Sequence, residues 1–343
     1  MTRQFDSTTR PASLRQGKTR RFILMAAAAT LAIVAGGTAA QAKELVIGWT
    51  SYPADLPVIA DAIDGSKTAA AAIGARMEFA LSAGAAAQAN AMDNLITLGV
   101  DVIAIDPEDS KAIGPSIKKA NEAKIPVIMF IGDNLGGGQT ATLISSDEEA
   151  GGYNIAKWAF QQIGGKGKVA LVQGAKAHQA GQLRENGFRK AMTEFPGIEL
   201  VGYGEANWMP DKANALAADM LAKDPDLKLI VALSDGMAKG VAAAVKAAGV
   251  TPAITGYNGD CETLNKVWTG QITGDLYQGW RDIGSQVVRT AAGISAGKTI
   301  PPKIIMPVTI VDKPLMDKIN GGSTDGVTPG LVADVKHAVA GCK

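Results

Sequence analysis

The sequence has few of the residues on which redox, metal and nucleophilic sites depend. Its 343 residues include two histidines and two cysteines, and Cys261 and Cys342 do not form a C-x-x-C pair. Thiol redox chemistry and a zinc site are therefore poorly supported. No G-x-S-x-G elbow occurs, and Gly164–Lys168 lacks the spacing of a phosphate loop. We expect a protein that is not an enzyme and needs no cofactor or metal.

Charge of one sign is also scarce. The formal net charge is +1, and no basic run occurs beyond the N-terminus. Because phosphate binding needs a concentrated basic face, nucleic acid is not an expected partner. Aromatic residues make up only 5% of the chain, whereas glycine is abundant. This composition favours helices packed closely on sheets, with glycine at turns and helix ends.

The first 42 residues differ from the rest. Six basic residues and one acidic residue precede or border an apolar run at 22–34, which ends in a small-residue segment, Ala40-Gln41-Ala42. This order is typical of a secretory signal peptide cleaved after Ala42, and places the mature protein in the periplasm. The alternative is a membrane anchor, but the apolar run is short for a bilayer. The remaining chain carries a mild negative charge.

Cysteine pairing follows from export. In an oxidising compartment two cysteines usually form a disulfide. We expect Cys261 and Cys342 to pair and to fasten the C-terminal tail to the loop at residue 261. Two free thiols are the alternative.

Short apolar segments alternate with longer helical ones along residues 43–311. The segments Val102–Ile105 and Leu229–Leu233 are continuously apolar, as strands buried on both faces should be. Lys303–Val311 ends the series as a further strand. Strand and helix alternation predicts an α/β fold with parallel sheets. Eleven predicted strands favour two doubly wound sheets over one.

Ligands of doubly wound sheets bind beyond the carboxyl ends of the strands. The loops expected there are rich in Trp, Tyr, Asp, Asn, Gln and Ser, which suits a neutral polar molecule. His178 lies in one of these loops and is a candidate for lining a site. Asp106-Pro107 ends a strand and is interpreted mainly as a turn and helix entry.

Several ordered motifs together resemble the type I periplasmic binding proteins, in the ribose- and galactose-binding branch. The resemblance runs from about Glu44 to about Val311. The motifs that carry it are Leu45–Gly48, Leu98–Pro107, Ala123–Ile128, Val172–Gly174, Arg184–Phe188, Ser234–Ala238 and Gly256–Gly259.

The resemblance implies two lobes joined by three crossing segments, near Ser145-Ser146, Tyr277-Gln278 and Pro307. The expected N-terminal lobe comprises residues 43–145 plus 279–307. The expected C-terminal lobe comprises residues 146–278 plus 308–343, including a C-terminal extension. The family fold closes over its ligand and presents the closed form to a transporter.

The resemblance also implies ligand-binding positions, taken one at a time. Asn258 stands where the family usually has Asp, and Gln278 fits a Gln beside the hinge. Ser234, with Asp235 beside it, follows the strand at 229–233. Other positions come from three loops: Gln182 and Arg184; Asp133 and Asn134; and Trp49 and Tyr52 in place of paired aromatics. Trp208 resembles an aromatic residue that stacks on a sugar ring.

The amide at residue 258 reads a different pattern of hydroxyl groups from a carboxylate, which argues against ribose itself. We expect a sugar, polyol or cyclitol, delivered by a monomeric protein to the membrane subunits of an ABC importer. The alternative is a secreted sensor whose partner is a chemoreceptor or sensor kinase. A secreted dehydrogenase would need G-x-G-x-x-G after the first strand, where Trp49-Thr50-Ser51 stands. A sugar-responsive repressor would carry a DNA-binding segment at the N-terminus.

Overall fold

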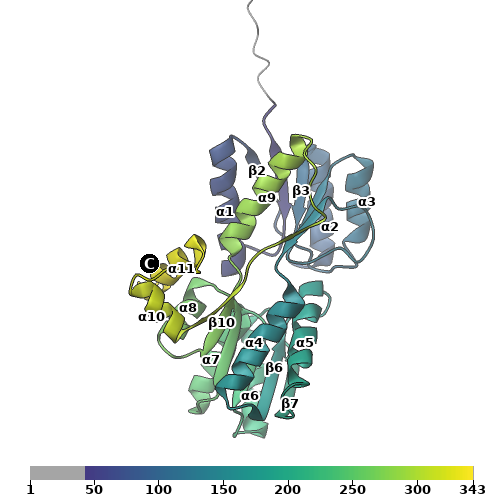
Figure 1. The fold of residues 1–343 in the computed structure, drawn as a ribbon. Coiled ribbons are helices and arrows are strands. Elements are labelled where there is room, and N and C mark those ends of the chain that lie inside the picture. The colour runs from purple at the N-terminus through teal and green to yellow at the C-terminus, as the bar shows by residue number, and fades with distance from the viewer. Residues whose placement is uncertain (1–42, 343) are drawn as a thin grey trace, which may run out of the picture. The chain divides into compact units, whose positions relative to one another are not determined.

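The structure, a computed structural model, describes residues 43–342. The predicted signal peptide and its cleavage site lie outside these residues. Within them the chain forms twelve strands and eleven helices, divided between two six-stranded sheets. This confirms the predicted α/β fold with two doubly wound sheets (Figure 1).

The sheet of the N-terminal lobe has the strand order β2-β1-β3-β4-β5-β11, and all its strands are parallel. Its elements are β1 (Val46–Thr50), β2 (Arg76–Phe79), β3 (Val102–Ile105), β4 (Val127–Phe130), β5 (Thr142–Ser145), β11 (Lys303–Ile305), α1 (Pro57–Ile73), α2 (Ala85–Leu98), α3 (Gly114–Glu122) and α9 (Trp280–Ser295).

The sheet of the C-terminal lobe has the order β7-β6-β8-β9-β10-β12, and only β12 runs antiparallel to its neighbour. Its elements are β6 (Lys166–Gln173), β7 (Gly197–Glu205), β8 (Leu229–Ala232), β9 (Ala253–Asn258), β10 (Gly274–Tyr277), β12 (Thr309–Asp312), α4 (Glu148–Gln162), α5 (Gln179–Met192), α6 (Pro210–Lys223), α7 (Asp235–Ala248), α8 (Cys261–Trp268), α10 (Lys313–Asn320) and α11 (Pro329–Val339).

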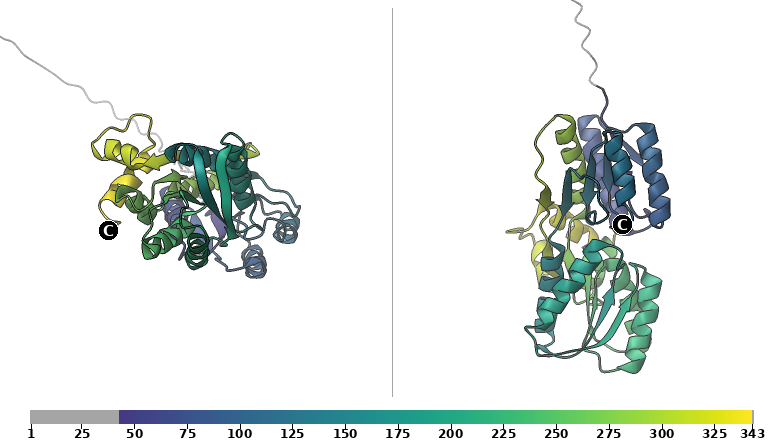
Figure 2. Two further views of the ribbon diagram at one scale, coloured as in Figure 1. Left: turned by 90° about the horizontal axis from the view of Figure 1, so that it is seen from below. Right: turned by 90° about the vertical axis from the view of Figure 1, so that its right-hand side faces the viewer.

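Helices cover both faces of each sheet, as the two views in Figure 2 show. Strand β3 illustrates why its sequence is apolar throughout. Val102 and Ala104 pack in the cluster beneath α1 and α9, while Ile103 and Ile105 pack in the cluster beneath α2 and α3. Successive side chains point to opposite faces of a strand, so a strand covered on both sides needs apolar residues at every position.

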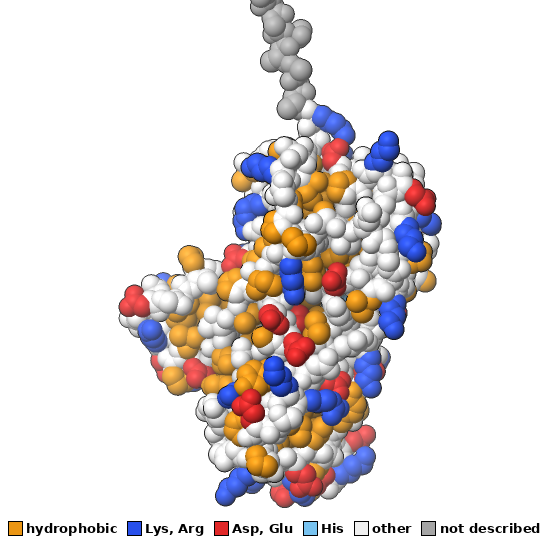
Figure 3. All heavy atoms as spheres, turned by 45° about the vertical axis from the view of Figure 1, so that its right-hand side comes forward, with side chains coloured by type: hydrophobic (Ala, Val, Ile, Leu, Met, Phe, Trp, Pro, Cys, Tyr) orange, Lys and Arg blue, Asp and Glu red, His pale blue; other side chains and the backbone are white. Residues whose placement is uncertain are grey.

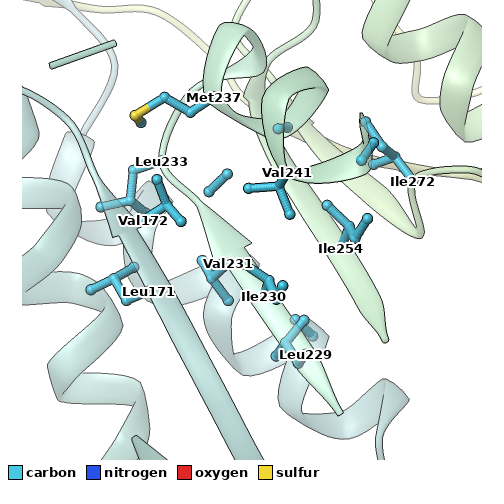
Figure 4. Packing of buried hydrophobic residues seen from close by; sticks show 14 of the residues in the cluster. Leu171, Val172, Leu229, Ile230, Val231, Leu233, Met237, Val241, Ile254 and Ile272 are labelled. Carbon is cyan, nitrogen blue, oxygen red and sulfur yellow. The ribbon is translucent and has the colours of Figure 1, made fainter. Parts of the chain in front are cut away.

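The core of the C-terminal lobe follows the same rule. Figure 4 shows residues of β6, β8 and β9 packed against Met237 and Val241 of α7. The helix begins at this point because Ser234 accepts a hydrogen bond from the backbone N–H of Met237. It ends at Gly249, which has the left-handed conformation. Serine at the start and glycine at the end are the residue types that commonly mark helix ends.

The chain passes between the two sheets at three places: between β5 and α4, between β10 and α9, and between β11 and β12. The segment Lys303–Val311, predicted as one strand, is therefore two strands in different sheets. Pro307 lies between them, where its missing N–H ends the ladder. The lobe boundaries given above remain our proposal.

The C-terminal segment forms α10 and α11, which pack beside α8 (Figure 1). The predicted Cys261–Cys342 disulfide is present and joins the start of α8 to the end of the described chain. The Tyr277 hydroxyl also donates to Asp334 of α11 at 2.7 Å. On the face shown in Figure 3, basic and acidic side chains are interspersed. Among residues 43–342, no helix is long and apolar enough to cross a membrane.

Candidate functional site

A cavity lies between the two lobes and takes residues from both. Its volume is about 70 Å³, where a single water needs roughly 10–15 Å³, so it has room for a small molecule. The N-terminal lobe and the crossing into α9 contribute Tyr52, Leu56, Pro57, Val58, Ile59, Asp106, Ile131 and Trp280. The C-terminal lobe contributes His178, Ala180, Arg184, Trp208, Ser234, Gly236, Asn258 and Asp260.

His178 and Asp106 meet across the two lobes. His178 Nε2 lies 3.0 Å from Asp106 Oδ1, and both side chains are buried. His178 Nδ1 accepts from the backbone N–H of Ala180, so the proton is on Nε2, which donates to the carboxylate. Burial raises the pKa of Asp106, while this hydrogen bond from His178 opposes the rise.

Aromatic rings enclose His178. The Trp208 ring is perpendicular to the imidazole, with centroids 5.8 Å apart, and the Tyr52 ring lies 6.1 Å away. Glycine makes room for the indole, because a Cβ on Gly174 would stand 1.9 Å from it. A wider hollow of about 420 Å³ shares Tyr52, Leu56 and Trp208 with the cavity. These residues therefore separate the inner cavity from an outer one.

A buried ion pair supports the wall of the cavity beside the crossing segments. Arg184 Nε donates to Glu148 Oε2 at 2.7 Å, and its guanidinium stacks 3.8 Å from the Tyr257 ring centroid. Burial opposes the charge of Arg184, but the Glu148 carboxylate outweighs it, so the pKa of Arg184 is raised.

Glu148 also connects two of the three crossing segments. Its Oε1 accepts from the hydroxyls of Ser145 and Ser146, and from Gln278 Nε2. Gln278 Oε1 accepts from Arg184 Nη2 at 3.3 Å. Hydrogen bonds to charged groups in a buried network strongly fix geometry, so the ion pair orients residues of both crossings.

Asn258 ends β9 with φ of 129°, which turns its amide into the cavity. One atom of this amide lies 2.9 Å from Gln278 Oε1 and 3.1 Å from Trp280 Nε1. The network that begins at Glu148 therefore reaches the ligand cavity through Gln278 and Asn258.

Two helices begin at the cavity wall of the C-terminal lobe. Ser234 caps α7, and Asp260 caps α8 by accepting from Thr263 N at 2.8 Å. The other Asp260 oxygen accepts from Lys239 Nζ at 2.8 Å. Asp235 is buried behind this wall and accepts from backbone N–H groups of Tyr257 and Asp260.

Half of the twelve predicted site residues line the cavity, namely Tyr52, His178, Arg184, Trp208, Ser234 and Asn258. Gln278 and Asp235 lie directly behind it. Four other residues lie elsewhere. Trp49 is fully buried against Phe130, and Gln182 is exposed and bonds to Lys176 O. The Asn134 side chain hydrogen-bonds within its own loop, and Asp133 accepts from the Asn134 N–H. Neither residue lines the cavity.

The sequence interpretation missed two features of the cavity. Asp106 was interpreted as a turn residue, yet it is buried and lines the cavity; its position after a fully apolar strand was the available signal. The first turn of α1, at Leu56–Ile59, forms an apolar wall that no motif indicated. No cluster of metal-ligating side chains occurs among the described residues.

The two lobes and the cavity between them have the architecture of a solute-binding protein. A family profile, the periplasmic binding protein domain, matches residues 47–299. The chain belongs to this family, which confirms the resemblance found in the sequence.

Similar proteins bind sugars and polyols. The chain is 32% identical to a D-ribose/D-allose-binding protein of Pseudomonas aeruginosa, over 47% of this chain and 52% of that protein. It is 27% identical to a xylitol-binding protein of Mycolicibacterium smegmatis, over 81% and 80% respectively. A solute-binding protein of an ABC transporter from Actinobacillus succinogenes, with D-allose bound, superposes with a TM-score of 0.75 at 25% identity, covering 79% of this chain and 98% of that one.

Proposed function

We propose that this protein binds a small neutral polyhydroxylated molecule between its lobes in the periplasm and delivers it to an ABC importer. The cargo is a sugar, polyol or cyclitol, and the protein performs no chemical step. The observation that carries the proposal is a cavity between two lobes in which every charged side chain already has a partner.

Each charged side chain that lines the cavity already has a partner. Arg184 is paired with Glu148 and Asp260 with Lys239, while Asp106 accepts a hydrogen bond from the neutral imidazole of His178. An anionic ligand would need an unpaired positive charge, because a buried charge without a partner is strongly unfavourable. Hydroxyl groups need only donors and acceptors, and the Asp106 carboxylate, the Asn258 amide and the Ser234 hydroxyl supply both.

The two sides of the cavity differ in polarity. The N-terminal lobe presents Leu56, Val58 and Ile131, while the C-terminal lobe presents most of the polar groups. A hydroxyl facing the apolar wall would lose its hydrogen bonds with water, at about 1–3 kcal/mol. We therefore propose a ligand whose hydroxyls lie along one edge and whose C–H groups face α1, as in a deoxy sugar.

Closure follows from contacts that exist only when the lobes meet. A ligand that touches Asp106 on one lobe and Asn258 on the other stabilises the closed state by its differential affinity. Loop 52–56 and Trp208, which separate the inner cavity from the outer hollow, form the entrance that closure narrows.

A thermal-shift screen tests the ligand class. The panel contains pentoses, hexoses, polyols and cyclitols, with matched pairs such as D-galactose and D-fucose, or L-mannose and L-rhamnose. A ligand raises the melting temperature by mass action on the native state. If no member of the panel shifts the melting temperature, the proposed function is wrong.

The variant Val58→Thr tests the apolar edge, because it adds a hydroxyl with little change of shape. We expect the wild type to prefer the deoxy member of a pair, by up to about 100-fold, and Val58→Thr to reduce that preference. Val332→Thr on α11, outside the cavity, is the matched control. A wild type that prefers the fully hydroxylated members contradicts the apolar edge but not the binding function.

The membrane partner is tested by capture of importer subunits from membranes, with and without the ligand found in the screen. Ligand-dependent capture of importer subunits supports delivery. Capture of a chemoreceptor or sensor kinase instead supports the secreted sensor, which would use the same cavity.

A further inference from the structure

Two buried carboxyl groups lie behind the cavity, in the wall of the C-terminal lobe. Asp235 is the first residue of α7 and Asp275 lies on β10, and both are almost fully buried. They meet over Gly256 of β9: a Cβ there would lie 2.8 Å from Asp235 Oδ1 and 2.7 Å from Asp275 Oδ1. The same small gap, left open by a glycine, therefore holds both carboxyl groups.

Asp235 holds the loop that carries two cavity residues. Its Oδ1 accepts from Tyr257 N at 3.0 Å, and its Oδ2 accepts from Asp260 N at 2.5 Å. These two N–H groups flank Asn258, and both Asn258 and Asp260 line the cavity. The Asp235 carboxyl thus fixes both ends of the ligand-facing loop without touching the ligand.

Asp275 is short of hydrogen-bond donors. The backbone groups of Leu276 and Gly259 favour its ionised form, but neither carboxyl oxygen has a hydrogen bond of good geometry among the described residues. Asp235 already accepts two backbone N–H groups, so a proton on Asp275 would make it a donor toward the Asp235 carboxylate across the gap at Gly256. A shared proton therefore satisfies both groups where two carboxylates would repel.

The surrounding charges do not relieve this repulsion. Asp260 adds a third carboxylate from the start of α8. Lys239 of α7 is the cation of the cluster, and it already pairs with Asp260 at 2.8 Å and with exposed Glu262 at 3.1 Å. Burial and the neighbouring carboxyl groups raise the pKa of Asp235, and burial above all raises the pKa of Asp275 to about 7.

We propose that Asp235 is a positioning residue for the ligand-facing loop, and that a proton shared with Asp275 keeps it in place. Loss of the proton sets two carboxylates against each other and loosens the loop at Asn258–Asp260. If the proposed function holds, ligand affinity falls in the same pH range.

The Asp275→Asn variant tests the shared proton, because an amide cannot ionise but still donates to Asp235. In the wild type the folded state holds a proton on Asp275 that the unfolded chain releases near pH 4. The stability supplied by that proton is therefore present at low pH and is lost as pH rises from about 4 to about 7. The melting temperature of Asp275→Asn minus that of the wild type should therefore increase between pH 5 and pH 8, by on the order of 5 °C. Asp93→Asn, a half-exposed residue of α2 paired with Lys119, is the control and should follow the wild type.

Loop order is measured separately from stability by hydrogen exchange at the backbone amides of Tyr257 and Asp260, corrected for the intrinsic effect of pH. Protection of both amides should fall through about pH 7 in the wild type and stay constant in Asp275→Asn. Infrared spectra of the wild type should contain a protonated carboxyl band that disappears over the same pH range. Because this measurement needs no variant, it tests the shared proton even if Asp275→Asn does not fold.

A pH profile of Asp275→Asn identical to that of the wild type, or no protonated carboxyl band at pH 6, would overturn the proposal. None of these measurements uses a ligand. Failure of the shared proton is therefore distinguishable from failure of the proposed function.

Discussion

His178 of the C-terminal lobe donates from Nε2 to Asp106 of the N-terminal lobe over 3.0 Å, with both side chains almost fully buried. The pair joins the two lobes directly. Gly132 permits the contact, since a Cβ there would stand 2.7 Å from His178 Nε2. The imidazole also orients Asp106, so one residue both links the lobes and fixes an acceptor in the cavity.

Replacing His178 with alanine should weaken both closure and the fold. Asp106 would remain buried without this donor, at a cost of about 1–3 kcal/mol. We expect a lower free energy of unfolding in urea and a larger radius of gyration in X-ray scattering. His337→Ala removes the other histidine, which is exposed on α11, and should change neither quantity. Equal behaviour of the two variants would show that the interlobe hydrogen bond does not stabilise closure.

Gly174→Ala should displace the Trp208 indole. The new methyl group would overlap the ring, and overpacking of this kind destabilises by about 1–3 kcal/mol. Tryptophan fluorescence should change, and the ligand found in the thermal-shift screen should bind more weakly. Gly321→Ala, after α10, meets only backbone oxygens at 3.2 Å or more and serves as the control. Unchanged affinity in Gly174→Ala would remove Trp208 from the binding surface.

Replacing both cysteines with serine should destabilise the chain. The disulfide spans 81 residues, and a crosslink of that span stabilises by about 4 kcal/mol through loss of entropy in the unfolded chain. Urea denaturation measures the difference. Because Cys261 directly follows Asp260, we also expect weaker ligand binding. The double variant should be as stable as the reduced wild type. A double variant as stable as the oxidised wild type would contradict a stabilising role for the disulfide.

Removing Glu148 should be more damaging than removing its charge alone. In Glu148→Ala, Arg184 remains buried without a counterion, which costs about 3–5 kcal/mol. Glu148→Gln keeps the shape and one acceptor, so it should lose less. Exposed Glu194, paired with Lys157 at the surface, offers a control as Glu194→Ala, which should lose little. A similar loss in Glu148→Ala and Glu194→Ala would contradict the role given to Glu148.

Local signals in the sequence were sufficient for the sheets. The residues of β3 and β8 are apolar at every position, and Ser234 and Gly249 mark the two ends of α7. Such signals involve neighbours in the chain, so they can be read without the fold. The prediction of a single strand at Lys303–Val311 was wrong, because the sheet that a strand joins depends on which other strand pairs with it in the fold.

The site was only partly predictable. Trp49 and Tyr52 come from one short segment and were equal candidates in the sequence. In the structure the strand pleat directs Trp49 into the core, while Tyr52 lies beyond the strand and lines the cavity. Asp106 and His178 are 72 residues apart, and nothing local to either one indicates the other.

The sequence by itself determined the two-sheet α/β fold, the membership of the family, the disulfide and most of the residues at the carboxyl ends of the strands. The tertiary structure alone decided which of those residues meet across the lobes, that their charged groups have partners, and that α1 closes the cavity with an apolar wall. The reason is physical. Periodicity and caps are interactions between residues close in the chain, whereas a cavity is made by residues brought together only when both lobes are folded.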